Sequence, residues 1–209
     1  SLCFENPSSK TYHVSLKITN VQETNLTLKM PSWMPGYYQL MNYADQLQNM
    51  QIKDETGGVI SFKNPTKNSW LLENVQNRTI ILEYDILTKR KFVATSYVDE
   101  SHAYIVNANT FLYPEKQIQS PVTVKIIPNT AWKDITTGLE RIDGKTNEFK
   151  AADFDVLYDS PFLIGNLKEL PSFELKGIKH RFIGYDMGNF DEVDFMKKVK
   201  AVVKAASDI

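Results

Sequence analysis

Apolar residues that alternate with polar ones are the feature of this sequence that most restricts its fold. In the clearest segment, Ile80 to Ile86, every second residue is large and apolar. The segments Tyr12 to Ile18 and Leu26 to Met30 follow the same period of two. Because successive side chains of a strand point to opposite faces, this period predicts strands with one buried face. Short segments of this kind continue to Tyr185, so we expect about a dozen strands.

The period changes near the C-terminus. Apolar residues there recur at three- and four-residue spacing: Phe195, Val199, Val202, Val203 and Ala206. This spacing predicts an amphipathic helix. Asn189, with Glu192 three residues later, is typical of a helix N-cap. The predicted fold class is therefore all-β, a mostly antiparallel β-sandwich or saddle, with one C-terminal α-helix.

Turn residues and residue types predict the connections. We expect a short helical turn within 42–49, a strand over 92–98 and a last strand over 180–185. Turns or loops are expected at 21–25, 54–58, 99–102, 132–138 and 143–144. The turn at 21–25 should join two paired strands, and residues 59–62 should return as the partner of the strand that begins at Met50.

Composition excludes several classes of function. The chain has 209 residues and a formal net charge of −1. This charge balance gives no reason to expect a nucleic-acid partner. No apolar stretch is long enough to span a bilayer, so we expect no membrane span. The single cysteine, Cys3, cannot form an internal disulfide.

The sequence shows no catalytic constellation and no metal-binding motif. None of the three histidines, His13, His102 and His180, belongs to an H-E-x-x-H pattern. The stretch Gly138 to Thr146 has five residues between its glycines, one too many for a phosphate-binding loop, and reads as a hairpin turn. We therefore predict no catalytic residue, metal ligand or cofactor in this chain itself.

The segment Met30 to Ala44 is an unusual turn. It reads M-P-S-W-M-P-G-Y-Y-Q-L-M-N-Y-A, so large aromatic residues surround the turn dipeptide Pro35-Gly36. Connecting segments are usually polar. Two interpretations follow. The segment folds back onto the core as a plug, or it presents its aromatic side chains to a ligand or a neighbouring domain. If Trp33 is buried, its replacement by alanine should cost about 3–5 kcal/mol.

This segment resembles the N-terminal domain of the glycyl aminopeptidase family, zinc peptidases of the thermolysin-like (gluzincin) type. The resemblance rests on W-x-P-G-x-Y followed by N-Y-A, and on the D-x-L-x-D-S-P-x-x-x-G pattern of Asp155 to Gly165. It extends over roughly residues 10–185. The chain departs from the family pattern at Tyr37, where a small hydroxyl residue is usual, and at Met41 and Ala94, where arginine is frequent.

The resemblance implies a non-catalytic β domain at residues 1–186 and a helix at 187–209 that begins a catalytic domain. The zinc ion and its ligands would lie in that later domain, which would be the partner of this one. A peptide N-terminus would be the substrate, and a periplasmic or secreted location would be expected. Candidates for contact with the substrate cleft or the other domain are Trp33, Pro35, Gly36, Tyr37, Tyr38, Tyr43, Asp159 and Ser160.

An alternative function is open to such a chain. A stand-alone β-sandwich with Trp33, Trp70 and Trp132 would present rings on which sugars or a peptide stack. The terminal helix argues against this alternative, because its apolar side needs a surface to cover it.

Overall fold

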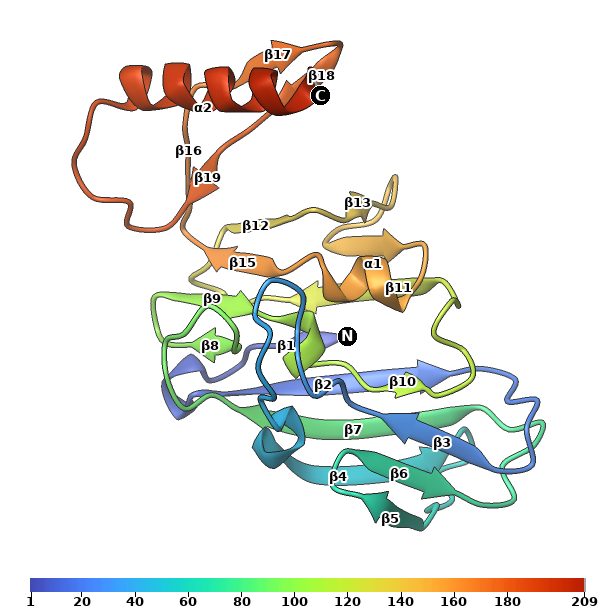
Figure 1. Ribbon diagram of the computed structural model, residues 1–209. Coiled ribbons are helices and arrows are strands. Elements are labelled where there is room, and N and C mark those ends of the chain that lie inside the picture. The colour runs from blue at the N-terminus through green and yellow to red at the C-terminus, as the bar shows by residue number, and fades with distance from the viewer. Residues whose placement is uncertain (209) are drawn as a thin grey trace.

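The computed structural model describes residues 1–208, and the last residue of the predicted segment 187–209 lies outside them. A large sheet runs through the centre (Figure 1). Its strands, in spatial order, are β13 (Glu140–Arg141), β14 (Glu148–Ala151), β11 (Val122–Ile127), β1 (Leu2–Cys3), β2 (Thr11–Ile18), β7 (Ile80–Leu87) and β4 (Leu47–Asp54). All its pairs are antiparallel except β1 with β11.

Two smaller sheets cover this central sheet (Figure 1). One consists of β10 (Tyr113–Pro114), β3 (Leu26–Lys29), β6 (Ser69–Leu72) and β5 (Phe62–Thr66). The other consists of β12 (Asp134–Thr137), β15 (Phe162–Gly165), β9 (His102–Ile105) and β8 (Tyr97–Val98). The predicted fold class, mostly β and mainly antiparallel, is confirmed.

The alternating pattern forms the core as expected. Ile80, Leu82, Tyr84 and Ile86 of β7 are all fully buried, and their neighbours in sequence are partly exposed. The apolar cluster that they join extends from Leu2 to Ile164. Burying this much apolar surface is the main driving force for folding.

Helical segments are few and short apart from one. A five-residue helix, α1 (Phe154–Tyr158), and 3-10 turns at Pro7–Ser9, Tyr43–Gln46 and Asn107–Asn109 lie among the strands. The predicted helical turn within 42–49 is confirmed. The long helix, α2 (Glu192–Ser207), follows the strands as predicted.

Helix α2 lies apart from the sheets (Figure 1). It packs on the hairpin of β17 (Phe173–Leu175) and β18 (Ile178–His180), and the pair β16 (Lys168–Glu169) and β19 (Ile183–Gly184) joins this unit to the body. Phe195 contacts the rings of Phe182 and Phe190, with centroids 5.0 and 5.2 Å apart. Met196 of α2 is buried, whereas Val202 of the predicted apolar stripe is 68% exposed.

Two predictions near α2 are wrong. The N-cap is Asp191 rather than Asn189, because the Asp191 carboxylate accepts the backbone N–H groups of Val193 and Asp194. The predicted single strand over 180–185 is split between β18 and β19.

Several connections also differ from those expected. The segment 21–25 is not a hairpin, since β2 pairs with β7 and β3 with β6. Val21 is fully buried, and its N–H donates to the carbonyl of Arg78, so this segment passes from one sheet to another. The segment 132–138 is not a loop throughout, because its residues 134–137 form β12 along the edge of β15, with Ile135 buried.

Other segments follow the expectation in part. Of residues 92–98 only the last two form a strand, and His102, expected in a turn, begins β9. Residues 59 and 60 return beside β4 as expected, but Phe62 pairs with Leu72 in a different sheet. The hairpin turn at Asp143-Gly144 is confirmed between β13 and β14, with Gly144 at φ +70°.

Candidate functional site

The aromatic loop, residues 30–43, is closed by its own backbone. The Pro35-Gly36 turn is confirmed, with Gly36 at φ +82°, a conformation that glycine adopts without strain. The N–H of Tyr37 donates to the carbonyl of Met34 over 3.3 Å. Nearer the base, the N–H of Met41 donates to the carbonyl of Ser32 over 2.7 Å. These bonds hold the loop as a narrow projection from the end of β3.

Both ends of the aromatic loop are anchored in the body. At one end, the side-chain amide of Asn68 donates to the carbonyl of Met30 over 2.9 Å and to Ser32 Oγ over 3.1 Å. At the other end, Tyr43 is fully buried, and its hydroxyl donates to the carbonyl of Ala94 over 2.7 Å. Burial raises the pKa of the Tyr43 hydroxyl, so it stays protonated as a donor.

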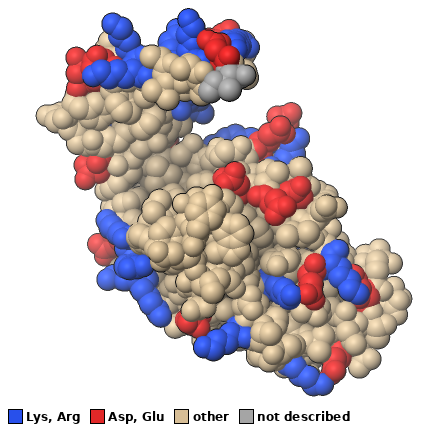
Figure 2. Space-filling model, viewed as in Figure 1, with Lys and Arg blue, Asp and Glu red and all other residues tan. Residues whose placement is uncertain are grey.

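The tip of the aromatic loop is exposed. Trp33 is 50% exposed, Tyr38 85% and Leu40 75%, and the rings of Trp33 and Tyr38 lie 6.3 Å apart. The plug interpretation therefore holds for Tyr43 and not for the tip. Figure 2 shows the loop as a bulge without charged side chains in the middle of this face.

A second loop, residues 88–95, supports the aromatic loop from one side. The ring of Tyr37 meets the ring of Phe92 edge-on, with centroids 5.1 Å apart. The guanidinium of Arg90 lies 4.4 Å from the centroid of Phe92 on that ring. Val93 is 64% exposed. Exposed apolar side chains on two adjoining loops are typical of a surface that contacts another molecule or domain.

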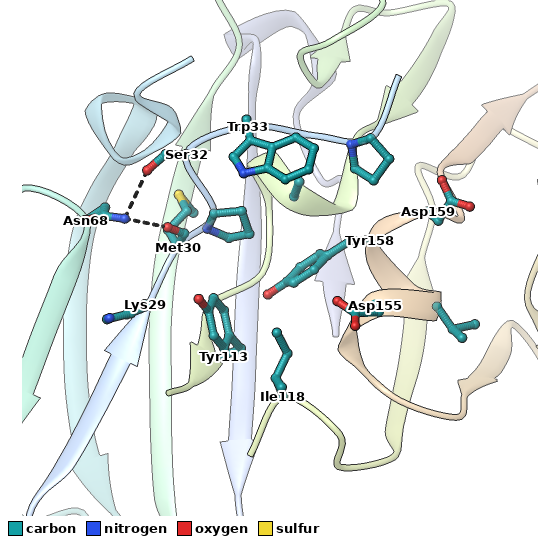
Figure 3. A pocket seen from close by; sticks show the side chains of 14 residues that line it. Lys29, Met30, Ser32, Trp33, Asn68, Tyr113, Ile118, Asp155, Tyr158 and Asp159 are labelled. Atoms are coloured by element: carbon teal, nitrogen blue, oxygen red, sulfur yellow. Dashed lines mark hydrogen bonds between the residues drawn. The ribbon is translucent and has the colours of Figure 1, made fainter. Parts of the chain in front are cut away.

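A pocket of about 690 Å³ separates the aromatic loop from α1 (Figure 3). We call it the loop–helix pocket. Its lining is Lys29, Met30, Pro31, Ser32, Trp33, Pro35, Asn68, Ala108, Tyr113, Ile118, Asp155, Val156, Tyr158 and Asp159. The pocket brings together Trp33 and Pro35 from the first motif and Asp159 from the second, residues more than a hundred positions apart in sequence.

The turn after α1 is fixed by hydrogen bonds from a buried side chain. Asn107 donates its side-chain amide to the carbonyls of Leu157 and Ser160, over 2.8 and 2.6 Å. Asp153 caps the start of α1 by accepting the N–H of Val156. Asp159 is thereby presented at the pocket, whereas Ser160 is not among the lining residues and lies against Gly138. The adjacent Asp159 and Ser160 thus have different surroundings.

The predicted residues are therefore brought together only in part. Trp33, Pro35 and Asp159 share the pocket, and Gly36, Tyr37 and Tyr38 lie at the tip of the aromatic loop. Tyr113, Asp155 and Tyr158 line the same pocket and were not among the residues predicted for the site. Asp155 and Tyr158 belong to the D-x-L-x-D-S-P motif, so that motif carried the signal that would have found them.

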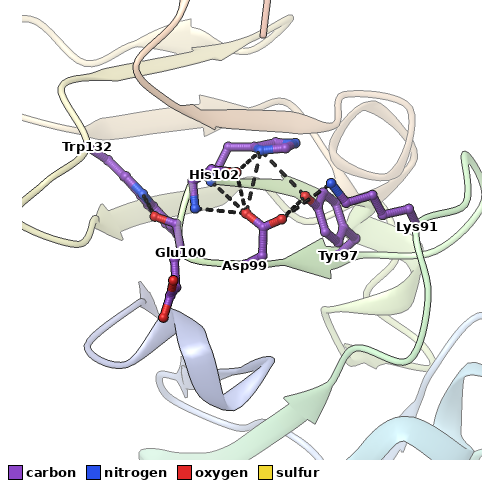
Figure 4. Close-up of polar contacts among 7 residues, drawn as sticks. Lys91, Tyr97, Asp99, Glu100, His102 and Trp132 are labelled. Carbon is purple, nitrogen blue, oxygen red and sulfur yellow. Dashed lines mark hydrogen bonds and ion pairs between the residues drawn. The ribbon is translucent and has the colours of Figure 1, made fainter. Parts of the chain in front are cut away.

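A polar cluster around Asp99 lies at the start of β9 (Figure 4). The Asp99 carboxylate accepts the backbone N–H groups of Ser101 and His102, over 2.8 and 3.2 Å, and the hydroxyls of Ser101 and Tyr97. Lys91 Nζ lies 3.3 Å from its second oxygen. Although burial acts to raise the pKa of Asp99, these hydrogen bonds hold it well below its usual range.

His102 connects this cluster to the C-terminal segment. Its ring stacks on Tyr185, with centroids 3.8 Å apart, and meets Tyr97 edge-on. Burial lowers the pKa of His102, and the negative charge of Asp99 opposes this effect. Ser101 Oγ lies 2.8 Å from His102 Nδ1 and also donates to Asp99. This is not a catalytic triad, because serine and aspartate both approach the Nδ1 side of the ring.

Other features of the described chain bear on function. No group of three or more His, Cys, Asp or Glu in residues 1–208 is placed to hold a metal ion. None of the helices in that part of the chain is long and apolar enough to cross a membrane.

Comparisons with solved structures show similar folds. The aminopeptidase N family protein from Idiomarina loihiensis has a TM-score of 0.79 and 24% identity, over 87% of this chain and 31% of that one. Aminopeptidase A from Legionella pneumophila, solved with aspartic acid, has a TM-score of 0.51 and 17% identity, over 87% of this chain and 22% of that one. At these identities the likeness shows the fold alone, and the present chain spans less than a third of either protein.

The family is shown by a different comparison. No curated protein matches the chain. The family described as the peptidase M61 N-terminal domain matches residues 1–166, which include the aromatic loop, α1 and the whole apolar cluster. The predicted resemblance to the glycyl aminopeptidases is thereby confirmed. The chain belongs to the peptidase M61 family and contains its N-terminal domain.

Proposed function

We propose that this chain is the non-catalytic N-terminal domain of a zinc aminopeptidase, and that its aromatic loop forms part of the wall of the substrate cleft. An N-terminal domain of a peptidase implies a catalytic domain. M61 is a family of metallopeptidases, and a zinc-activated water in the catalytic domain would attack the peptide bond. We propose a periplasmic or secreted location from the family resemblance alone.

The exposed tip of the aromatic loop is the observation on which this proposal rests. Trp33, Tyr38 and Leu40 are each at least half exposed, although the loop base is fixed by Tyr43 and Asn68. Exposed aromatic residues on a rigid support cost solvation free energy unless another surface covers them. A projecting wall of this kind would narrow the cleft, so that only a chain end enters, as an aminopeptidase requires.

The stand-alone binding module receives less support. Trp70 and Trp132 are 6% and 5% exposed, so only Trp33 of the three tryptophans presents its ring. Trp132 Nε1 donates to the carbonyl of Glu100 over 3.2 Å, which is a structural contact (Figure 4). A platform of several stacked rings, which sugar binding generally uses, is not formed by these residues.

The first experiment measures zinc content and the hydrolysis of glycyl- and alanyl-anilides. It compares this chain with a protein that also contains the catalytic domain. We expect the chain alone to be inactive and free of zinc, and the longer protein to hold zinc and to lose activity with a chelator. A longer protein without zinc or activity would overturn the aminopeptidase proposal.

The second experiment tests the cleft wall in the longer protein. We expect Tyr38→Ala and Trp33→Ala to lower kcat/KM for short peptides while zinc content stays unchanged. Val59→Ala is the matched control, because Val59 is 82% exposed in the turn after β4, outside the aromatic loop. If both loop variants keep the kcat/KM of the unmodified protein, the aromatic loop is not part of the cleft wall.

A further inference from the structure

The lining of the loop–helix pocket is largely apolar and includes three aromatic and two proline side chains. Figure 3 shows Trp33, Tyr113 and Tyr158 around one space. Tyr158 is fixed because its hydroxyl donates to the carbonyl of Phe111 over 3.1 Å, and its ring meets that of Tyr113 at an interplanar angle of 72°. A pocket with such walls accepts a hydrocarbon chain and gives π faces to a cation.

One side of the loop–helix pocket is acidic. Asp155 in α1 and Asp159, the C-cap residue that follows this helix, both line it (Figure 3). No salt bridge within residues 1–208 involves either carboxylate. Figure 2 shows acidic side chains gathered over α1, next to the uncharged bulge of the aromatic loop. The pocket therefore pairs two free negative charges with an apolar interior.

The cationic residue of the lining, Lys29, is already paired with an acidic side chain. Lys29, on the side of the pocket opposite α1, forms a salt bridge with Glu115. The hydrogen bond to Glu115 also raises the pKa of Lys29. Because this pair is internally balanced, the charge that the pocket offers a ligand is that of Asp155 and Asp159.

We propose that the loop–helix pocket binds a primary ammonium group carried on a hydrocarbon stem, as a peptide offers in a lysine side chain or at its N-terminus. The stem would lie against Trp33, Tyr113 and Tyr158, and the ammonium would face the two carboxylates. Charge complementarity selects this ligand over a neutral or an acidic one. The site belongs to the chain itself and does not require that the aromatic loop line a substrate cleft.

The test is a titration of the 209-residue chain, followed by chemical shifts of backbone amides and of the Trp33 indole N–H. The probes are Nα-acetyl-lysine methylamide, its neutral counterpart Nα-acetyl-norleucine methylamide, and alanyl-alanine amide. We expect the norleucine probe to bind about tenfold more weakly than the better of the two ammonium probes. The stronger of those two identifies the source of the ammonium, a side chain or a chain end.

Variants locate the binding site. The double variant Asp155→Asn and Asp159→Asn keeps the size of both exposed side chains and removes their charge, and should weaken binding of the ammonium probe about tenfold. Glu140→Gln is the matched control, because it removes an exposed acid on β13 and should leave binding within about twofold. Thermal unfolding checks that each variant is folded.

Two results would overturn the proposal. One is norleucine-probe binding as tight as that of the better ammonium probe, and the other is unchanged binding of that ammonium probe by the double variant. The outcome is separable from that of the proposed function. Charge-dependent binding by this chain would stand even if Trp33→Ala and Tyr38→Ala left the kcat/KM of the longer protein unchanged.

Discussion

Trp33 and Tyr43 belong to the same loop, but they make different contributions to stability. Tyr43 is fully buried and donates a hydrogen bond, whereas half of Trp33 is exposed. We expect Tyr43→Ala to lower the free energy of unfolding by about 3–5 kcal/mol, and Trp33→Ala by about 1 kcal/mol or less. Urea unfolding of the two variants measures both values. Equal losses would mean that the tip of the loop is packed rather than exposed.

His102 gives the fold a dependence on pH. Its pKa is lowered by burial, so the folded chain keeps it neutral where the unfolded chain already binds a proton. Its contribution to stability is therefore complete above the unfolded pKa of about 6.5 and is lost as the pH falls below that value. The charges near it are Asp99, Lys91 and Asp186.

The variant His102→Gln isolates this effect. We expect the wild-type chain to lose more unfolding free energy than the variant between about pH 7.5 and 5.5. Denaturant unfolding at the two pH values measures the difference. Asp99 acts at lower pH. Because its folded pKa is depressed, its contribution is complete above the unfolded pKa of about 3.9 and is lost as the pH falls below that value. A variant with the wild-type slope would show that His102 does not titrate in this range.

At the scale of single elements, the contact between β9 and β15 depends on a glycine. A Cβ atom at Gly165 would lie 2.8 Å from the Cβ of His102 and 3.3 Å from the carbonyl oxygen of Ser101. Neither atom is the end of a flexible side chain, so Gly165→Ala must push the two strands apart. We expect a loss of about 1–3 kcal/mol of unfolding free energy by thermal or urea unfolding. Gly138→Ala, with its nearest contact at 3.5 Å, is the control and should lose less.

Helix α2 depends on its N-cap. Asp191 accepts two backbone N–H groups, and the residue predicted for this role, Asn189, lies outside the helix. Asp191→Ala should therefore destabilise α2 by about 1 kcal/mol, and Asn189→Ala should change little. Amide hydrogen exchange in α2 measures this local stability. If Asn189→Ala speeds exchange as much as Asp191→Ala, the capping assignment is wrong.

The sequence predicted single strands and helices better than it predicted the segments with which they pair. The alternation in β7 and the spacing in α2 are local patterns, and both predictions hold. The crossing at Val21 depends on a hydrogen bond to Arg78, far away in sequence, which no local pattern reveals. Strand β12 was missed for a similar reason, since it forms along the edge of β15 and carries little apolar alternation of its own.

At the scale of the whole molecule, the candidate site likewise has a part that the sequence predicted and a part that only the fold reveals. The aromatic loop was recognised because its composition is unusual for a turn. The exposure of Trp33 and the burial of Tyr43 could not be predicted, because they depend on which residues of the loop reach the core. The loop–helix pocket forms only when residues 29–35 meet 155–159 in space. Asp159 was a candidate from the sequence, but its place beside Asp155 in one pocket was identified from the structure.

The body, which contains the apolar cluster up to Ile164, and the C-terminal unit of β17, β18 and α2 differ in the number of buried apolar residues that support them. The apolar cluster contains no residue beyond Ile164, and Leu170 and Met196 are the buried apolar residues of the remaining described chain, 165–208. The unit of β17, β18 and α2 is therefore supported mainly by its own contacts and by the stack of Tyr185 on His102. Regions with few buried apolar contacts open at lower free energy than the core.

Hydrogen exchange of the whole chain tests this difference. We expect the amides of β2 and β7 to exchange only through global unfolding, and those of α2 to exchange through a local opening of lower free energy. Tyr185→Ala should lower the opening free energy of the C-terminal unit further and leave β7 unchanged, because it removes the stack on His102. Equal protection of α2 and β7 would mean that the two parts unfold together. Addition of the catalytic domain should then raise the protection of α2 if that domain covers Val193 and Val202, which are 74% and 68% exposed.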